Sequence, residues 1–480
     1  MINSITAYYA KPYTAAPSAP QVKPPAFEYK NTMPVTASNL LAYVADFQNT
    51  PTVDVKFYNT PAIDELVKKY GTVMQNNITD LRARGGKAGQ VLNWIGTLPK
   101  TQLSRLDEIY ALADSMKSTG PDKLGIIGIG GSKHTVENLL TLSGNNDKAV
   151  FLSAVDPQSM DNFIKKLGDL NQATVMVASK SGTTLEPSTG YEYVHDAFVE
   201  KFKQDFLKQG MSESDATAKA KAETAKHFVC ITDTNSEKSK LRKIAQEEGY
   251  KYGVIHDDCG GRFGAFDDHT LTALAFCGMS KDDMKKMLES SLKAQQKFMN
   301  TDLNKNLAAQ RAMFTADAVL SGKPEQSDYY FGDAFNGTLL WNTQLKKESH
   351  KSLYKATGDL IGPEFLHNST ESDLNAGNKT SFYTFNTLKN DGSNDYKVYN
   401  ALVNGALKAY SQRHPVSVIA LKNLSPDAIA EFVELKHFET MYTGMLLRNL
   451  KGEANPAVLP EVEQPGVKIY KEEVNKILNH

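Results

Sequence analysis

The stretch LGIIGIGGS, residues 124–132, is a short apolar run that ends in two glycines and a serine, and a helical pattern follows it. A run of this length, bounded by a turn, is typical of a strand buried on both faces. Four similar runs follow, and helical patterns such as 185–202 and 236–248 separate them. This alternation predicts a parallel sheet covered by helices on both sides. The four further runs span residues 149–155, 173–178, 228–232 and 252–256.

A second set of strands and helices follows the first. Strands are expected at 327–331, 381–385 and 416–421, among helical patterns at 303–320, 397–410 and 426–449. The sequence therefore predicts an α/β protein with two domains that join near residue 285. Residues 37–116 show a mainly helical pattern, and residues 11–25 contain five prolines, which predicts an extended arm. We expect an arm and helices in 1–120 that pack on the second domain, domains at 121–285 and 286–455, and a C-terminal turn and helix in 456–480.

Composition excludes several classes of function. The chain of 480 residues has 54 basic and 55 acidic side chains, so its net charge of −1 provides no field that would attract nucleic acid or an anionic membrane. The three cysteines form no CxxC pair, which favours a reducing cytoplasm. We expect no signal peptide and no membrane span, since no apolar run approaches roughly 20 residues. The sequence has no HExxH motif and no His/Cys cluster, so it predicts no metal site.

The segment VASKSGTTLEP, residues 177–187, is the sharpest local signal. A strand is expected to end at Ala178 and a helix to begin near Leu185. The intervening residues could bind phosphate, because a helix N-terminus has unpaired N–H groups and hydroxyls can donate to phosphate oxygens. The alternative is a polar turn in which a hydroxyl caps the helix. The polar side chains in question are Ser179, Lys180, Ser181, Thr183 and Thr184.

Two pairs of adjacent glycines, 130–131 and 260–261, mark further places where the backbone could approach a ligand closely. Ser132 follows the first pair. Arg262 follows the second pair, and its guanidinium could stabilise an oxyanion. The first pair does not belong to a dinucleotide fingerprint, because Lys133 stands where the third glycine should be. The alternatives are a tight strand-to-helix turn for the first pair and a solvated arginine for the second.

Three other positions could take part in chemistry. Glu348 closes a helical run over 339–347, and the alternative is a solvated helix end. His367 lies in a stretch, 362–370, that we expect to be a loop, and most single histidines are structural or exposed. Residues 463–471 are expected to form a turn that enters a last helix, with a plain amphipathic helix as the alternative.

Together these pieces resemble the glucose-6-phosphate isomerase family. The matching motifs occur in family order, at 128–132, 179–184, 260–263, 348–349, 367 and 464–471, so the resemblance covers most of the chain. It implies two sugar-isomerase-type αβα sandwich domains. It also implies a cytoplasmic homodimer that acts in glycolysis and gluconeogenesis. It also implies that the chain interconverts glucose 6-phosphate and fructose 6-phosphate through a cis-enediolate, without a metal or organic cofactor.

The resemblance assigns a role to each motif. Glu348 resembles the base that carries the proton between C1 and C2, and Arg262 resembles the arginine that stabilises the enediolate. His367 and Lys471 resemble the pair that opens the sugar ring, with His367 supplied by the partner chain of the dimer. The remaining matches imply contacts to phosphate or sugar, at Gly131, Ser132, Ser179, Lys180, Ser181, Thr184, Gly261 and Gln464.

The sequence also departs from the family. Glu348-Ser349 is followed by His-Lys-Ser where the family has Asn-Gly-Lys. Residues 361–366, IGPEFL, replace Gly-Thr-Asn-Gly-Gln and resemble the version found where this isomerase is fused to a transaldolase. Lys468 replaces the glutamate of Gln-Pro-Gly-Val-Glu. Two alternatives stay open: a sugar-phosphate-binding regulator without turnover, and an isomerase that also accepts mannose 6-phosphate or prefers another phosphosugar.

Overall fold

Two five-stranded sheets organise the protein in this computed structural model. The structure describes residues 52–480 except 88–89, 361–362, 376, 390–395, 456–458 and 479–480, and all of them lie in one compact unit, Met33–His480. The proline-rich segment 11–25 lies outside the described residues. In the described part of the chain, no helix has the length and apolar character that a membrane crossing requires.

The first sheet is parallel throughout. Its three central strands, at 123–127, 173–178 and 228–232, are largely or fully buried because helices cover both faces, as alternate side chains of one strand show. Val175 and Val177 pack with helices α6 and α7, whereas Met176 packs on the opposite side with α4, α5 and α10. In spatial order the strands are β3 (Ala149–Leu152), β2 (Lys123–Ile127), β4 (Ala173–Ala178), β5 (Phe228–Thr232) and β6 (Lys251–Val254).

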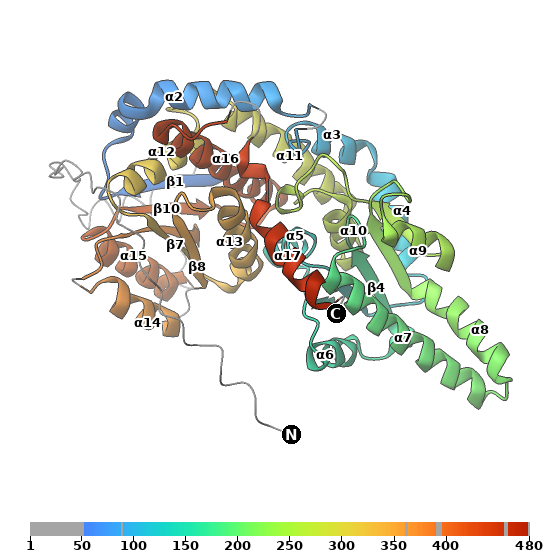
Figure 1. Ribbon diagram of the computed structural model, residues 1–480. Helices are drawn as coiled ribbons and strands as arrows, with labels where there is room; N and C mark the ends of the chain where they lie inside the picture. The colour runs from blue at the N-terminus through green and yellow to red at the C-terminus, as the bar shows by residue number, and fades with distance from the viewer. Residues whose placement is uncertain are drawn as a thin grey trace. The chain divides into compact units, whose positions relative to one another are not determined.

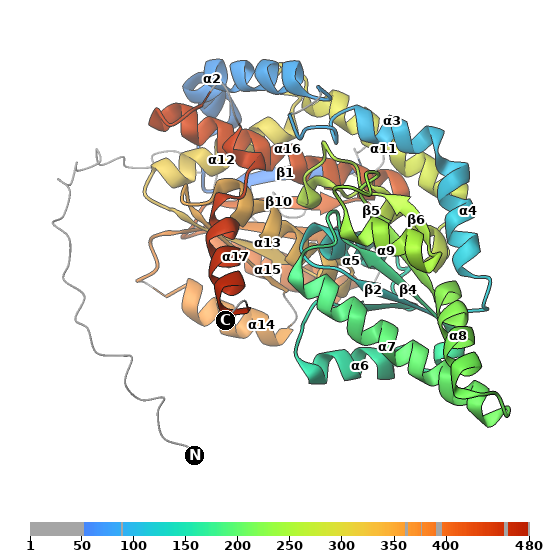
Figure 2. The same cartoon turned by 45° about the vertical axis from the view of Figure 1, so that its right-hand side comes forward.

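The helices of this half alternate with its strands, as expected for parallel crossovers. Figure 2 shows α6 and α7 beside the first sheet. Helix α9 packs into the same buried cluster as these two helices, whereas α5 belongs to the cluster on the opposite face. The elements are α4 (Leu106–Met116), α5 (Gly131–Leu142), α6 (Pro157–Leu167), η1 (Leu170–Gln172), α7 (Leu185–Lys208), α8 (Glu213–Thr224), η2 (Ala225–His227), α9 (Lys240–Glu248), η3 (Gly261–Phe263) and α10 (Asp268–Cys277).

The second sheet is mixed. Its first strand in the chain, β1, pairs antiparallel with the last, β10, and all other neighbours are parallel. Tyr329 and Tyr383 pack with α15 on one face, whereas Tyr330 and Phe382 belong to the core that the two sheets share. In spatial order the strands are β1 (Val53–Tyr58), β10 (Val416–Leu421), β9 (Ser381–Leu388), β7 (Glu325–Tyr330) and β8 (Lys355–Leu360).

Helices from both ends of the chain complete this half. Both views show α2 running beside α16 and α12 (Figures 1 and 2). The elements are α2 (Ile63–Arg84), α3 (Thr97–Ser104), α11 (Lys281–Phe298), α12 (Leu307–Leu320), η4 (Asp333–Phe335), α13 (Asn336–His350), α14 (Pro363–Asp373), α15 (Lys397–Ser411), α16 (Pro426–Lys451), η6 (Pro460–Val462) and α17 (Pro465–Leu478).

Local signals explain many of the element boundaries. Helix α6 begins after Asp156, whose carboxylate accepts a hydrogen bond from the Ser159 amide at 2.9 Å, and Pro157 occupies its first position. It ends at Gly168, where φ is +76°. Serine stands at the N-cap of α9, α11 and α16, a proline follows it at α16, and glycine stands at the C-cap of α9 and α16.

The expected α/β class is confirmed, and the structure differs from the expected elements in three places. Residues 37–116 were expected to be mainly helical, and within them Val53–Tyr58 is the edge strand β1. Strand β8 was not anticipated, since KATGDL has little apolar character. His367 does not lie in a loop: helix α14 includes it.

Candidate active site

The order of strands in the first sheet marks the place where a ligand should bind. The chain passes from β2 outward to β3 on one side, and from β4 outward to β5 and β6 on the other. Ligands of open parallel sheets bind beyond the carboxyl ends of the two strands where the order reverses. Those ends are followed by the segments 128–132 and 179–184, which contain both phosphate-binding candidates.

The segment 179–184 is a tight, internally bonded loop. The Gly182 amide donates to Ser179 Oγ at 3.2 Å, and the Thr183 amide donates to Ser181 Oγ, also at 3.2 Å. Gly182 has φ of +65°, and a Cβ there would lie 2.3 Å from the backbone nitrogen of Leu241. Only glycine fits this position, so the loop conformation is determined by the packing of its backbone against α9.

Thr184 stands at the N-cap of α7, but its side chain makes no capping hydrogen bond. The alternative in which this hydroxyl caps the helix is therefore wrong, and the hydroxyl is available to a ligand. Lys180 is more constrained, because its amine donates to the carbonyl of Asp257 at 2.8 Å and lies 3.1 Å from the carboxylate of the same residue.

The two glycine pairs meet. A Cβ on Gly131 would lie 2.1 Å from the carbonyl carbon of Gly261 and 2.7 Å from the amide nitrogen of Arg262. Neighbouring Gly130 has φ of +53°, and a Cβ on it would lie 2.9 Å from Nε2 of Gln344. The turn before α5 is therefore packed tightly between helix α13 and the loop that carries Arg262, which we call the arginine loop.

Arg262 is almost completely buried, and its guanidinium bonds to three groups. Nε donates to Ser349 Oγ at 3.1 Å, Nη1 donates to Glu348 Oε2 at 3.1 Å, and Nη2 donates to the carbonyl of Glu461. Burial lowers the pKa of Arg262, and the carboxylate of Glu348 opposes that shift. The alternative of a solvated arginine is therefore wrong.

Glu348 lies in the last turn of α13 with its side chain 24% exposed, so its carboxylate is accessible but not free. Gln344, one turn earlier, donates to Oε1 at 3.0 Å. Arg262 and Gln464 both donate to Oε2. Three donors from three parts of the chain orient this carboxylate, so the alternative of a solvated helix end is wrong as well.

Helix α13 reaches this place because it crosses α5 closely. A Cβ on Gly337 would lie 2.4 Å from the carbonyl oxygen of Glu137, and Thr338 donates to Asn138 Oδ1 at 2.6 Å. Two turns from Glu348, Trp341 Nε1 donates to the carbonyl of Arg262 at 2.9 Å. The helix that follows β7 of the second sheet is thereby attached to the arginine loop of the first.

The structure does not bring every expected residue to this cluster. His367 is exposed on α14, beside a groove between α14 and α15 that also includes Glu371. Lys471 is exposed on α17, the last helix that the sequence predicts, which begins at Pro465. Among the described residues, no hydrogen bond or ion pair joins either side chain to Glu348 or Arg262.

A buried charge cluster lies beneath the same helix. Lys346, two residues before Glu348, pairs with Asp328 at 2.7 Å and lies 3.5 Å from Glu439. Arg311 pairs with Glu439 at 2.6 Å, and Lys436 Nζ lies 3.9 Å from Asp328. Three cations thus meet two carboxylates. Among the described atoms the amine of Lys436 has no hydrogen-bond acceptor, and burial lowers its pKa to about 8.

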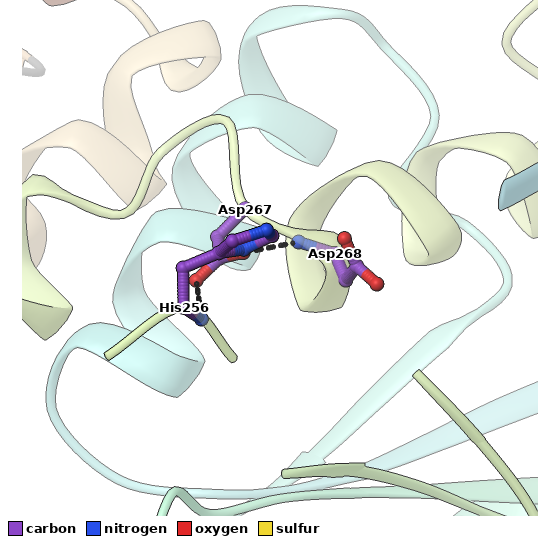
Figure 3. Close-up of side chains that lie close together, drawn as sticks. All are labelled: His256, Asp267 and Asp268. Atoms are coloured by element: carbon purple, nitrogen blue, oxygen red, sulfur yellow. Dashed lines mark hydrogen bonds and ion pairs between the residues drawn. The ribbon is translucent and has the colours of Figure 1, made fainter. Parts of the chain in front are cut away.

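Within the described residues, one group of side chains has the spacing of a metal site: His256, Asp267 and Asp268, whose ligand atoms lie within 4.8 Å of one another (Figure 3). Asp267 accepts from His256 Nδ1 at 2.6 Å and from the His256 amide at 3.1 Å. Asp268 accepts from Gln102 and Arg105. Because both carboxylates already have protein donors, we interpret the group as a brace for the loop between β6 and α10, which carries Arg262.

Sequence reasoning missed four residues that build the site. Gln344 stands four positions before Glu348, so helical spacing could have indicated it. Ser349 belonged to a motif but had no assigned role. Trp341 and Glu461 contribute through contacts between distant segments, and no local pattern indicates them.

Comparison with known proteins finds similarity to glucose-6-phosphate isomerases. The phosphoglucose isomerase family model matches residues 120–319. A glucose-6-phosphate isomerase of Clostridium novyi (strain NT) is 26% identical over 434 residues, which cover 83% of this chain and 89% of that protein. One of Caldanaerobacter subterraneus subsp. tengcongensis is 24% identical over 312 residues, which cover 62% of this chain and 63%, less than two thirds, of that protein.

Solved structures share the fold. A hypothetical protein of Thermus thermophilus has a TM-score of 0.72 at 21% identity, with 89% of this chain and 100% of that chain covered. A glucose-6-phosphate isomerase of Chlamydia trachomatis has a TM-score of 0.67 at 18% identity, with 93% of each chain covered. The matched family region contains both glycine pairs and the loop 179–184, while Glu348 and everything after it lie beyond that region. This chain is thus similar to phosphoglucose isomerases through residues 120–319, the part that the family model matches.

Proposed function

We propose that this protein is an aldose–ketose isomerase that interconverts glucose 6-phosphate and fructose 6-phosphate. The observation that carries the proposal is the pair formed by Glu348 and Arg262. A partly exposed carboxylate is oriented by three donors, one of which is a buried guanidinium 3.1 Å away. A proton carrier beside a fixed positive charge is what the formation of an enediolate requires.

The phosphate would bind at the loop 179–184. The hydroxyl of Thr184 caps no amide, and the N-terminus of α7 follows the loop directly. A phosphate there would meet backbone N–H groups and hydroxyl donors. Ser132, half-buried at the start of α5, faces the same end of the sheet and would supply a further donor. The position of the loop at the reversal of strand order supports this assignment.

The reaction then needs one proton carrier. Glu348 takes the proton from C2 of the open-chain aldose, and the electrons of that C–H bond form the C1–C2 double bond as the carbonyl at C1 becomes an oxyanion. Arg262 stabilises this negative charge. Glu348 returns the proton to C1, the hydroxyl proton of O2 moves to O1, and the carbonyl forms at C2. No atom is gained or lost.

Ring opening would use Lys471 and the partner subunit's His367 in a homodimer. The exposed position of His367 on α14 supports a role toward a second chain. Helix α17 supports association as well, since large apolar side chains on it are more than half exposed: Ile469, Tyr470, Ile477 and Leu478. We also propose a cytoplasmic setting, because Cys230, Cys259 and Cys277 are free and buried.

Exchange of substrate hydrogen with solvent deuterium tests the proposal. Wild-type protein should convert fructose 6-phosphate, exchange deuterium into its C1 position and place deuterium at C2 of the glucose 6-phosphate that forms. Glu348→Gln should bind substrate but lose about 10²–10⁴-fold in turnover and exchange, because an amide cannot accept the proton. Glu371→Gln, an exposed carboxylate on α14, is the matched control and should keep wild-type activity. Exchange near the wild-type rate in Glu348→Gln would overturn the assignment of the base, and binding without any turnover by wild type would favour a regulator.

A further inference from the structure

Lys351 holds an unusual backbone conformation directly behind the active-site helix. It is the residue at which α13 ends, three positions after Glu348, with φ of 56° and ψ of −118°. A side chain with a Cβ rarely adopts this conformation, whereas glycine adopts it readily. Among the described residues only Asn59 and Val91 share a positive φ without being glycine. A glycine would end the helix without this strain, so what lysine adds is its side chain.

That side chain reaches the segment that contacts the Glu348–Arg262 pair. Lys351 Nζ donates to the carbonyl oxygen of Pro460, the first residue of η6. The amine is partly buried, and burial together with the nearby Arg448 guanidinium lowers its pKa. A second donor to the Pro460 carbonyl is the Glu463 amide, at 3.3 Å. The lysine is therefore the main side-chain tether of this carbonyl.

The segment Pro460–Gln464 supplies two of the contacts of the active-site pair. The Glu461 carbonyl accepts from Arg262, and Gln464 donates to Glu348 Oε2. Its other anchor is the side chain of Glu461, which is fully buried and accepts from Arg448 Nε at 2.9 Å. Gly444 provides the room, since a Cβ there would lie 2.5 Å from the Glu461 side chain.

We infer that Lys351 is a positioning residue that, through the Pro460 carbonyl, holds the segment Pro460–Gln464 against Glu348 and Arg262. The inference rests on the proposed function of that pair. The strained backbone directs the lysine from the end of α13 toward η6, so that one residue links the helix that carries the base to the segment that orients it. Without the amine, Gln464 would leave Glu348 Oε2 for part of the time.

The effect should fall on turnover and not on binding. The carboxylate must meet the C2 proton in one orientation, and small misplacements of a reacting group reduce rates steeply. Among the described residues no hydrogen bond or ion pair joins Lys351 to the loop 179–184, so substrate affinity should persist. We therefore expect kcat to fall on the order of 10- to 100-fold while KM stays within about twofold.

Three substitutions separate the amine from the strain. Lys351→Met keeps the strain and removes the amine, so kcat should fall without a gain in Tm. Lys351→Gly removes both, so kcat should fall while Tm rises or holds. Lys351→Arg retains a donor and should recover most of the turnover, and added ethylammonium should partly restore Lys351→Gly. Asn59→Gly relieves a similar backbone outside the site, and it should raise Tm without changing kcat.

Hydrogen–deuterium exchange of the peptide that covers Pro460–Gln464 gives a readout independent of catalysis. Exchange should be faster in Lys351→Met than in wild type. Unchanged exchange together with unchanged kcat would overturn the inference. So would a loss of activity that neither arginine nor ethylammonium restores, or a parallel rise in KM, because either would mean general structural damage. If wild type itself does not isomerise the substrate, the proposed function fails, while the exchange experiment still decides whether the tether exists.

Discussion

Gly131 and Gly261 touch backbone to backbone, and the contact is asymmetric. A Cβ on Gly131 would lie 2.1 Å from the carbonyl carbon of Gly261, whereas a Cβ on Gly261 would meet nothing closer than 3.6 Å, the α-carbon of Gly131. The turn before α5 and the arginine loop are thus in contact at one point. At that point there is no room for a side chain on Gly131, whereas a Cβ on Gly261 would fit.

This asymmetry predicts different outcomes for two similar changes. Gly131→Ala should force the backbones apart, destabilise the protein by about 1–3 kcal/mol as overpacking does, and displace Arg262. Its kcat/KM should fall together with Tm. Gly261→Ala should leave Tm close to the wild-type value, because 3.6 Å is an ordinary contact. Thermal unfolding of both variants checks the prediction, and an equal loss of Tm in the two would contradict it.

Substrate affinity should depend on the loop 179–184. The double substitution Ser181→Ala and Thr184→Ala should raise the KM for fructose 6-phosphate, since each hydrogen bond lost to a charged group costs about 1.5–3 kcal/mol. Ser212→Ala is a useful control, because Ser212 caps α8 through the Asp215 amide. It should lower stability by about 1 kcal/mol without changing KM. An unchanged KM in the double variant would remove this loop from the site.

The proposed homodimer leads us to expect complementation between two inactive variants. If each site combines Glu348 of one chain with the partner subunit's His367, then Glu348→Gln and His367→Ala should each be inactive alone. After dissociation and random reassociation about half of the dimers are mixed, and roughly a quarter of wild-type activity should return. Mixed dimers that are shown to form yet remain inactive would mean that both groups act within one chain, or that His367 has no role.

Stability should depend on pH through Lys436. Its pKa is about 8 in the folded protein, below the ordinary value of 10.5, because the amine is buried. Between these pH values the unfolded chain holds a proton that the folded chain has lost, so the free energy of unfolding rises with pH, by at most about 1.4 kcal/mol per unit.

Lys436→Met removes that dependence and balances the charges of Arg311, Lys346, Asp328 and Glu439. The variant should be more stable than wild type at pH 7, by about 1–4 kcal/mol, and the difference should shrink as the pH rises from 8 to 10. Urea unfolding at several pH values measures it. A variant less stable than wild type at pH 7 would mean that the amine has a favourable partner in the folded protein.

The parts of the fold that sequence predicts are those with local causes. Strand β4 is six consecutive buried residues, and α6 has an acidic N-cap, a proline and a terminal glycine. Strand β1 escaped prediction because its charged side chains Asp54 and Lys56 lie in a region of helical character. Its partner, β10, lies at the far end of the chain, with Val53 opposite Leu421.

The same distinction between local and long-range causes applies to the residues of the candidate site. Ser179, Gly182 and Thr184 belong to one continuous loop, so their proximity follows from sequence alone. The contact between Gln464 and Glu348 joins residues 116 positions apart, and Arg262 reaches Glu461 over 199 positions. Such contacts depend on how η6 and α13 pack against each other, and no local sequence pattern predicts that packing. The helical conformation of His367 was missed because α14 has polar residues and few apolar ones.

The pairing of β1 with β10 sets the order in which a newly made chain can become active. The ribosome releases β1 early, and its partner strand only after most of the chain has been translated. Until then the edge of β1 is unpaired, and the glutamine that orients Glu348 has not yet been synthesised. A nascent chain can therefore contain the strands of its first sheet and the loop 179–184 long before Gln464 is available to orient Glu348.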